Sequence, residues 1–569
     1  MPSRPGPDDL AIARRVRLRP IAEVAAAAGI ARAHLVPYGR DVAKVELAAL
    51  DGPTSGPAGR LVVVTAITPT PAGEGKTATA VGLAQALRQL GHRATLTLRQ
   101  PSMGPTFGIK GGAAGAGHSQ VLPMETLNLH LTGDFHAVTA AHNLLAAMVD
   151  NHLHHGNPLG LDPRDIAWRR VLDVNDRALR HVVVGLGEHA DGVTRQSGFD
   201  ITAASEVMVI LALATSVADL RARLGRIVVG YTYAGRPVTA EDLHAAGAMA
   251  VLLRDALLPN LLQTSEHGPA LVHTGPFGNI ATGNSSVIAD LLAARTADYV
   301  VTEAGFGADM GLERLVNVKC RVSGQRPAAA VVVVTARALK MHAGRWPVRG
   351  GAARPDGPPA PDPAGVLAGA ENLRAQLRIV RRFGLTPVVA VNAFPDDHPT
   401  EHEVIRGVAE DLGVAVAVAT HVADGGAGAR DLAELVVAAA DGPVPALRPS
   451  YQLDAPLRDK IEALATDVYG AAGVDYSPRA RSDLQRFEVL GYGGLPVVVA
   501  KTHLSISADP TRRGAPTGWR LPVREVRAAA GAGYLYAVCG DMRTMPGLSR
   551  TPAATSIDLD PAGRIVGLS

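Results

Sequence analysis

The feature that most limits the fold of this chain is a glycine-rich loop between a predicted strand and a predicted helix. Residues 61–67 are mostly β-branched, as in a buried parallel strand, and residues 76–90 have the apolar spacing of a helix. Between them lies Thr70-Pro-Ala-Gly-Glu-Gly-Lys-Thr77. This segment resembles a Walker A loop in which Thr70 stands where the strict pattern has its first glycine. The pattern predicts a strand, a phosphate-binding loop and a helix in a parallel α/β sheet.

The rest of the chain continues this alternation of strands and helices. We therefore predict an α/β fold class: a P-loop domain with a mainly parallel sheet, and additional α/β domains. Parallel-type strands are expected around residue 96 and at 226–231, 298–302, 328–335 and 387–392, with a late strand at 533–539. Helices are expected at 286–294, 366–383, 400–412 and 430–440.

Shifts in composition divide the chain into four predicted parts. Residues 1–60 are expected to be a helical lead-in, because 11–50 are rich in alanine with helical apolar spacing. Residues 61–346 form the predicted P-loop domain with an inserted subdomain. Residues 347–365 are rich in proline and glycine and are expected to be an exposed connection. Residues 366–569 form the predicted C-terminal α/β part.

Composition excludes several classes of protein. The 569 residues carry a formal charge of only +3, which is too balanced to predict a nucleic-acid-binding surface. The longest aliphatic run, residues 207–214, is too short to span a membrane, and no signal peptide is recognised at the N-terminus. The two cysteines predict neither a disulfide framework nor a cysteine-rich metal site. We expect a cytoplasmic protein that acts on small molecules, without nucleic-acid or membrane partners.

The loop itself predicts ATP binding. Its backbone amides and the helix N-terminus would hold phosphate, Lys76 would reach the terminal phosphates, and the Thr77 hydroxyl would serve Mg²⁺. The alternative is an ordinary glycine-rich turn before a helix. The nucleotide-binding residues expected from the pattern are Thr70, Pro71, Ala72, Gly73, Glu74, Gly75, Lys76 and Thr77.

Two further sequence features point to the same site. Arg99 follows the second predicted strand, at the edge where an open α/β sheet binds its ligands, and its guanidinium suits a carboxylate or acyl phosphate. A surface cation is the alternative for Arg99. Only seven of the 56 basic residues are lysines, so a lysine kept in a glycine-rich loop indicates a need for a compact ammonium group. Lys76 and Lys110 meet that description.

Together these segments are similar to those of the formate–tetrahydrofolate ligase family, from about residue 20 to the C-terminus. The resemblance implies that formate is activated by ATP to formyl phosphate and that N10 of tetrahydrofolate then attacks it, which gives 10-formyltetrahydrofolate, ADP and phosphate. It also implies a homotetramer. The segments that carry the resemblance are 68–77, Phe107-Gly-Ile-Lys-Gly-Gly, Leu131-Thr-Gly-Asp-Phe-His136, residues 143–152, Glu303-Ala-Gly-Phe, Asn392-Ala-Phe-Pro395 and Met545-Pro-Gly-Leu548.

The resemblance also assigns roles to individual residues. Lys76, Arg99, Asp134 and His130 would be catalytic, although a structural role is an equal alternative for His130. The remaining expected substrate-binding residues are Lys110, Gly111, Gly112, Phe394 and Val422. Two other functions stay open: a related acyl-phosphate-forming ligase with a different acid or amine acceptor, and a nucleotide-binding homologue without catalysis.

Two departures from the family pattern affect these roles. The family motif Arg-Glu-Pro-Ser contains a glutamate that is associated with activation by a monovalent cation. This chain has Gln100 at that position, so we expect weaker potassium dependence. In the family, a tryptophan stacks on the pterin; at that position this chain has Val422. Two residues later, Asp424 replaces a lysine of the family motif. Loss of one aromatic stack costs on the order of 1–3 kcal/mol, by analogy with bases stacked on aromatic side chains.

Overall fold

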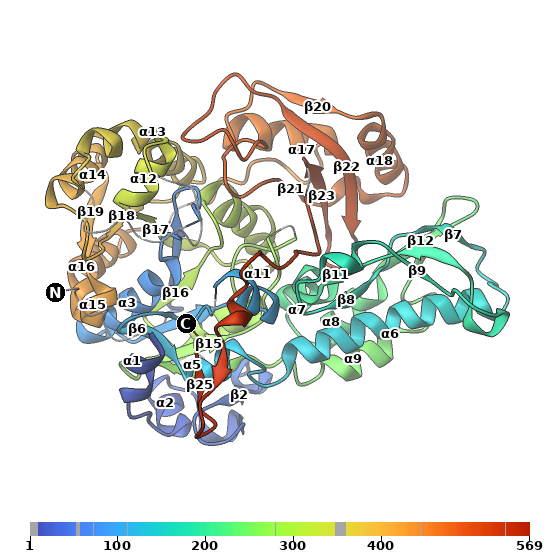
Figure 1. Ribbon diagram of the computed structural model, residues 1–569, viewed down its shortest axis with the longest axis horizontal. Helices are drawn as coiled ribbons and strands as arrows, with labels where there is room; N and C mark the ends of the chain where they lie inside the picture. The colour runs from blue at the N-terminus through green and yellow to red at the C-terminus, as the bar shows by residue number, and fades with distance from the viewer. Residues whose placement is uncertain are drawn as a thin grey trace.

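The computed structural model describes residues 9–52, 57–71, 73–110, 112–278, 280–346, 360–444, 446–540 and 542–568. A large sheet lies in one half of the molecule, an elongated arm extends on the other side, and a smaller C-terminal unit lies next to both (Figure 1). The predicted α/β fold class with a mainly parallel sheet is confirmed. In the described part of the chain, no helix combines the length and apolarity that a membrane span requires.

The large sheet has 12 strands, and β3 (Arg60–Ala66) lies inside it between β16 and β17. The strands β15, β4, β16, β3, β17, β18 and β19 are parallel to one another, and β14 runs antiparallel to β15. In spatial order the strands are β1 (Leu35–Pro37), β2 (Ala43–Val45), β14 (Asn260–Thr264), β15 (Pro269–Val272), β4 (Ala94–Leu98), β16 (Tyr299–Glu303), β3, β17 (Pro327–Val334), β18 (Pro387–Asn392) and β19 (Ala415–Ala419), with β6 (Ser119–Leu122) and β5 (Gly115–Ala116) beside β14.

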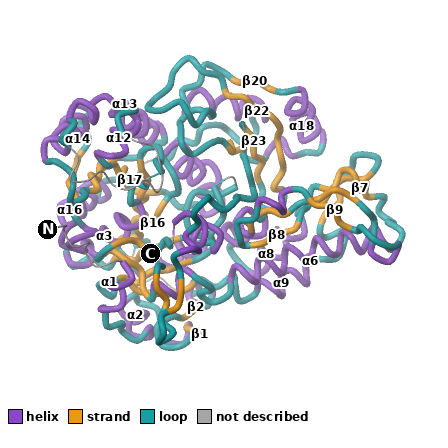
Figure 2. The backbone as a smooth tube through the Cα atoms, viewed as in Figure 1, coloured by secondary structure: helices purple, strands orange, loops and turns teal. Residues whose placement is uncertain are grey.

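Both faces of this sheet are buried. Along β3, Leu61 and Val63 belong to one hydrophobic core, whereas Val62 and Val64 belong to another on the opposite face. A strand with both faces buried consists mainly of apolar residues, so the position of β3 could be predicted from its sequence. Figure 2 shows the strands surrounded by helices. The helices that pack around the sheet include α3 (Lys76–Gln89), α10 (Val287–Thr296), α12 (Ala336–His342), α13 (Pro363–Arg382), α14 (Pro399–Asp411) and α16 (Arg430–Ala440).

The arm and the C-terminal unit have their own small sheets. In the arm, α6 (Asp134–His154) lies beside α9 (Ala246–Leu253), and β12 (Val228–Thr232) pairs with β7 (Leu161–Ile166) and β13 (Pro237–Thr239). Both pairings are antiparallel, so the expectation of a parallel strand at 226–231 was wrong. The C-terminal sheet has the order β20 (Val474–Tyr476), β22 (Leu521–Ala529), β23 (Tyr534–Cys539) and β21 (Val497–Ala500), with α17 (Leu457–Ala463) and α18 (Pro478–Val489) packed near it.

The N-terminal region is less helical than expected. After α1 (Asp9–Arg15) and α2 (Ile21–Ala27), the chain forms the two strands β1 and β2. These strands join the large sheet through the antiparallel pairing of β2 with β14, and all three residues of β2 are buried there. The expectation of an entirely helical segment over 11–50 was therefore wrong. Residues 347–359 of the predicted connection lie outside the described residues, and the large sheet continues beyond it in β18 and β19.

Glu313 is a buried carboxyl group that makes the stability of the fold depend on pH. It is fully buried, and only Asn317 donates a hydrogen bond to its carboxyl among the described residues. Burial raises its pKa from 4.5 to about 7, against the opposing effects of Arg314 and Asn317. The folded protein keeps this proton where the unfolded chain has lost it, so this group makes the free energy of unfolding fall as pH rises from 4.5 to 7.

We expect Glu313→Gln to remove that fall, which is on the order of 3 kcal/mol, because the amide keeps an acceptor for Asn317 and carries no charge. Urea unfolding between pH 5 and 8 measures it, with Glu23→Gln, an exposed position, as the matched control. A Glu313→Gln protein whose stability falls with pH as steeply as the wild type would contradict this assignment.

Candidate nucleotide and acyl-phosphate site

The phosphate-binding loop begins after β3 and ends at the first residue of α3. Gly73 and Gly75 have φ values of +75° and +77°, which favour glycine. A Cβ atom on Gly75 would lie only 2.2 Å from Nδ2 of Asn392, so the turn before the helix also needs glycine for space. The helix N-terminus follows at Lys76, as the pattern predicted. Ala72 lies outside the described residues.

Glu74 holds the loop together from inside. Its side chain is 2% exposed, and its Oε1 accepts hydrogen bonds from the Thr70 amide at 2.6 Å and from the Thr70 hydroxyl at 3.0 Å. Asn392, at the end of β18, donates to the Glu74 carbonyl at 3.0 Å. Lys76 Nζ lies 3.5 Å from Glu74 Oε2. The loop is therefore shaped by its own carboxylate and by a neighbouring strand.

Glu303 connects the loop to Arg99. It is the last residue of β16, which lies between β3 and β4, and its Oε2 accepts a hydrogen bond from Thr77 Oγ1 at 2.6 Å. Its Oε1 lies 4.0 Å from Nη2 of Arg99, which follows β4. Sequence reasoning placed Glu303 in a family segment but gave it no role. Its position directly after the predicted strand 298–302 was the signal, since parallel strands end at the same sheet edge.

Burial affects the two residues after β4 differently. Burial lowers the pKa of the Arg99 guanidinium, and the nearby Glu303 carboxylate opposes that shift. Arginine stays protonated in proteins, so Arg99 remains positively charged. Gln100 is 3% exposed, and neither atom of its side-chain amide has a hydrogen-bond partner among the described residues. A buried amide without partners is costly, so Gln100 is a position of functional interest.

The predicted catalytic residues Asp134 and His130 lie in different environments. Asp134 is 2% exposed at the start of α6, where Lys44 Nζ donates to its Oδ1 at 2.8 Å and Asn260 Nδ2 donates to its Oδ2 at 2.7 Å. His130 is exposed, and its Nδ1 lies 2.8 Å from Nε2 of His136. The roles given to Asp134 and His130 stay predictions, and the contacts of Asp134 are those of a buried ion pair.

The predicted folate-binding residues follow adjacent strands. Phe394 comes after β18 and Val422 after β19, and the two segments are joined by a 3.0 Å hydrogen bond from the Ala393 amide to the Ala419 carbonyl. The guanidinium carbon of Arg337 lies 3.4 Å from the centre of the Phe394 ring, so Arg337 covers one face of that ring. The Val422 carbonyl accepts from the His118 amide at 2.9 Å.

The other predicted substrate-binding residues are only partly described. Lys110 ends the π-helical segment Thr106–Lys110, but its side chain lies outside the described part, as does Gly111. Gly112 is described and leads into Ala113, whose amide donates to the side chain of Asn128 at 2.8 Å. These positions stay predictions.

The class of protein follows from this arrangement. A glycine-rich loop, the N-terminus of α3, Lys76, Thr77 and the Glu303 carboxylate meet at the carboxyl edge of a parallel sheet. This combination places the chain in the class of P-loop-containing α/β proteins.

Comparison with known proteins identifies the family. The family model described as formate–tetrahydrofolate ligase matches residues 7–569. A formate–tetrahydrofolate ligase of Cutibacterium acnes is 64% identical over 560 residues, covering 98% of this chain and 99% of that protein. Those of Saccharopolyspora erythraea and Roseiflexus sp. strain RS-1 are 63% and 60% identical, each covering 99% of this chain and 100% of its own length. The chain belongs to the formate–tetrahydrofolate ligase family.

The rarity of lysine has a structural explanation that extends beyond the loop. Five of the seven lysines are buried to 3% exposure or less, and each donates at least one hydrogen bond to an oxygen atom. An ammonium is a compact point charge, whereas a guanidinium is planar and larger, so the two are not interchangeable in buried sites. Retention of lysine could therefore have pointed to buried functional or structural positions throughout the chain. These lysines are Lys44, Lys319, Lys340, Lys460 and Lys501.

Proposed function

We propose that this chain ligates formate to tetrahydrofolate at the expense of ATP, with formyl phosphate as the intermediate. A formate oxygen attacks the γ-phosphorus and ADP leaves. N10 of tetrahydrofolate then attacks the formyl carbon, phosphate leaves, and the product is 10-formyltetrahydrofolate. The observation that carries this proposal is the convergence of Lys76, Thr77, Glu303 and Arg99 at one sheet edge, in a chain of this family.

The nucleotide would be held by the loop and the start of α3. Lys76 and the amides of Gly73–Thr77 bind the phosphates, as the positive end of the helix favours anions. The Thr77 hydroxyl and the Glu303 carboxylate are hard oxygen donors 2.6 Å apart, and this donor set fits the Mg²⁺ that accompanies ATP. Bound Mg²⁺ would neutralise charge on the phosphate oxygens.

Arg99 would bind the acyl phosphate. Its guanidinium lies next to Glu303 and therefore close to the position of the transferring phosphoryl group. Fixed positive groups in a partly buried site stabilise negative charge that builds up on transferring oxygens, which supplies most of the rate enhancement in such reactions. In this proposal Lys76, at the start of α3, and Arg99, just after β4, both approach the phosphoryl group.

The folate side of the site is proposed to include Phe394 and Val422. Because Arg337 covers one face of Phe394, the pterin would stack on the other face. Val422 offers no aromatic ring for a second stack. We also propose that residues 61–346 provide the nucleotide and formate site and that 366–569 contribute the folate site, in line with the positions of these residues.

A second candidate function is supported by this altered folate side. A related ligase that keeps acyl-phosphate formation but uses another amine acceptor would also retain Lys76 and Arg99 while changing Val422 and Asp424. The Asp424 carboxylate accepts from the Thr420 hydroxyl at 2.6 Å and is exposed, so it places a negative group where the family has a cation.

Release of ADP distinguishes these functions. The purified protein is incubated with ATP, Mg²⁺ and formate, with and without tetrahydrofolate. We expect ADP release that depends on both formate and tetrahydrofolate, with formation of formylated folate. Formate-dependent release that ignores folate would favour the second candidate. ATP binding without any acid-dependent release would contradict both and favour a non-catalytic homologue.

Gln100 leads to a prediction about monovalent cations. A neutral amide attracts potassium less strongly than the carboxylate of the family motif, because the site has one negative charge fewer. We expect turnover to change by less than about twofold when potassium chloride replaces choline chloride at equal ionic strength. The matched variant Gln100→Glu is expected to restore dependence on potassium. A strong, saturable rise in wild-type turnover with potassium would contradict the prediction.

We further propose a homotetramer in the cytoplasm. Exposed apolar side chains on the arm support association of copies: Leu186, Tyr233 and Val251 are 78%, 72% and 76% exposed. Cys320 and Cys539 are free and buried, which fits a reducing compartment.

A further inference from the structure

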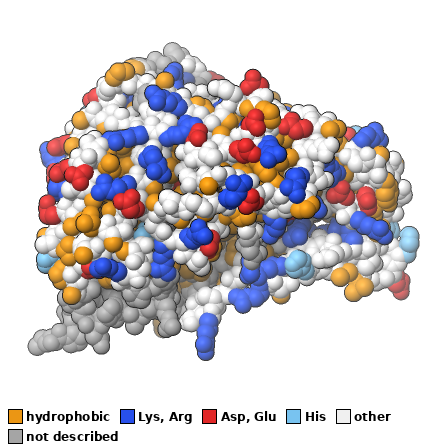
Figure 3. Space-filling model, turned by 90° about the horizontal axis from the view of Figure 1, so that it is seen from above, with side chains coloured by type: hydrophobic (Ala, Val, Ile, Leu, Met, Phe, Trp, Pro, Cys, Tyr) orange, Lys and Arg blue, Asp and Glu red, His pale blue; other side chains and the backbone are white. Residues whose placement is uncertain are grey.

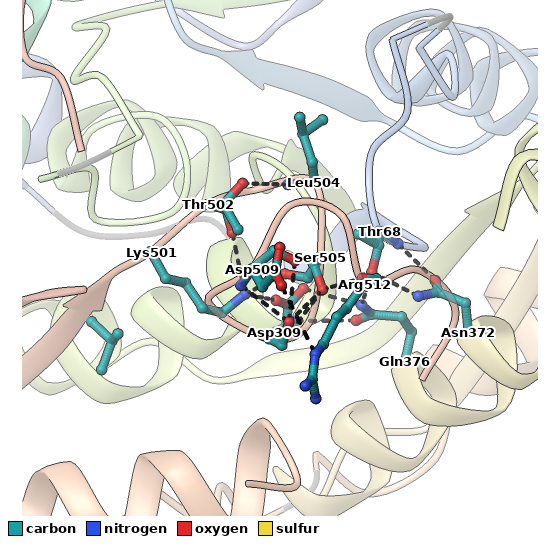
Figure 4. A network of polar contacts seen from close by, with 12 residues as sticks. Thr68, Asp309, Asn372, Gln376, Lys501, Thr502, Leu504, Ser505, Asp509 and Arg512 are labelled. Carbon is teal, nitrogen blue, oxygen red and sulfur yellow. Dashed lines mark hydrogen bonds and ion pairs between the residues drawn. The ribbon is translucent and has the colours of Figure 1, made fainter. Parts of the chain in front are cut away.

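A chain of buried polar contacts runs from the C-terminal unit to the entrance of the phosphate-binding loop (Figure 4). Lys501 Nζ donates to Asp309 Oδ2 at 2.7 Å. The other oxygen of Asp309 accepts from Gln376 Nε2 at 3.1 Å, and the same nitrogen lies 3.1 Å from Thr68 Oγ1. Lys501 directly follows β21, Asp309 lies in a segment after β16, and Gln376 lies in α13.

Thr68 is the point where this chain of contacts reaches the site. It stands two residues before Thr70 and is fully buried. Asn372 accepts from its amide at 2.9 Å and donates to its hydroxyl at 2.8 Å, and His342 Nε2 lies 2.9 Å from its carbonyl. Each polar group of Thr68 is therefore held by a side chain from α12 or α13.

The segment 501–514 also contacts these supporting side chains at its far end. Asn372 Nδ2 donates to the Gly514 carbonyl at 2.7 Å, and the Gly514 amide lies 3.3 Å from Nδ1 of His342. Within the segment, Lys501 Nζ donates to the Ser505 carbonyl at 2.8 Å. The segment therefore contacts Asn372 and His342 directly at Gly514, and at Lys501 it is connected to Thr68 through Asp309 and Gln376.

We propose that Lys501, through its ion pair with Asp309, is a positioning residue for the phosphate-binding loop. The segment 501–514 of the C-terminal unit thereby preorganises the nucleotide site. This inference rests on the proposed nucleotide-binding function and goes beyond it, because no residue from 501 onward belongs to the loop or its strand. A site whose supporting contacts are lost must order its loop when the ligand binds, and affinity falls accordingly.

Lysine suits this position for a physical reason. Lys501 and Asp309 are 0% and 2% exposed, so the ion pair is shielded from water, and Lys501 has carbonyl acceptors besides the carboxylate. Removal of one partner would leave the other charged and buried, which destabilises proteins strongly. A test therefore has to remove both charges together.

The test compares nucleotide affinity in three variants by calorimetric titration with Mg·ADP. Lys501→Met/Asp309→Asn removes the ion pair, and Thr68→Val removes the hydroxyl at the end of the chain of contacts, whereas Thr68→Ser keeps it. The matched control is Lys460→Met, since Lys460 is equally buried but donates to carbonyls of 453, 493 and 495 within the C-terminal part.

We expect the double variant and Thr68→Val to raise the Kd for Mg·ADP about tenfold or more, and Thr68→Ser and Lys460→Met to stay within about twofold of wild type. Thermal unfolding of each variant checks that it is folded; if the double variant fails to fold, Thr68→Val decides. A folded double variant with wild-type affinity, or a loss as large in Lys460→Met, would overturn the inference. A wild-type protein that does not bind Mg·ADP would instead overturn the proposed function.

Discussion

Lys76→Met is expected to reduce formate-dependent ADP release by roughly 10²–10³-fold, because it removes a positive charge from the position where negative charge builds up during phosphoryl transfer. Lys76 is the first residue of α3, and its Nζ forms a long ion pair with Glu74 Oε2 at 3.5 Å. Loss of so weak a contact should lower the melting temperature little. The measurement is ADP release under saturating ATP, formate and tetrahydrofolate, together with thermal unfolding.

Lys76→Arg is the sharper variant at this position. Most basic positions of this chain are arginines, so a loop that accepted a guanidinium would be expected to contain one. A planar guanidinium is bulkier than an ammonium and directs its hydrogen bonds differently, so it would not place its charge where the lysine does. We expect Lys76→Arg to be nearly as inactive as Lys76→Met. Either variant with more than about a tenth of wild-type turnover would contradict the role of Lys76.

Asp134→Ala is expected to destabilise the protein by about 3–5 kcal/mol, because Lys44 would be left buried without its partner. Lys44 is 1% exposed and Asp134 is 2% exposed, and the ion pair joins β2 to the start of α6. Urea unfolding measures the change. Activity should be lost together with stability, since the effect comes from the fold.

His130→Ala is the matched comparison for Asp134. Both residues belong to the same predicted active-site segment, but His130 is exposed and should be removed with little effect on stability. An Asp134→Ala protein that unfolds like the wild type and yet loses turnover would contradict the structural role and favour the catalytic one.

Local sequence patterns predicted the elements that lie in the parallel sheet. The strands β3, β16, β17 and β18 are fully or almost fully buried, so each is built mainly of apolar residues. The expected helices at 286–294, 366–383, 400–412 and 430–440 were confirmed within a few residues. Because parallel strands end at one edge, this was enough to place the loop and Arg99 at a common edge, whereas Phe394 was expected only from the family resemblance.

Contacts between distant parts of the chain were beyond local patterns. The strand β2 pairs with β14, more than two hundred residues later, and its own sequence is only the three residues Ala43–Val45. The partner of Asp134 lies 90 residues earlier in the chain. β12 pairs antiparallel with β7 and β13, and the residue pattern of β12 alone does not indicate the direction of its partner strands. These features follow from tertiary packing, which overrides local preference.

Transfer of the formyl group is the central claim, and isotope-labelled formate tests it most directly. The protein is incubated with ¹³C-formate, ATP, Mg²⁺ and tetrahydrofolate, and the products are observed by NMR. We predict that the label appears as a formyl carbon on N10 of the folate, only when ATP is present, with one ADP formed for each formyl group. ADP formation without labelled folate, or no turnover at all, would contradict this account.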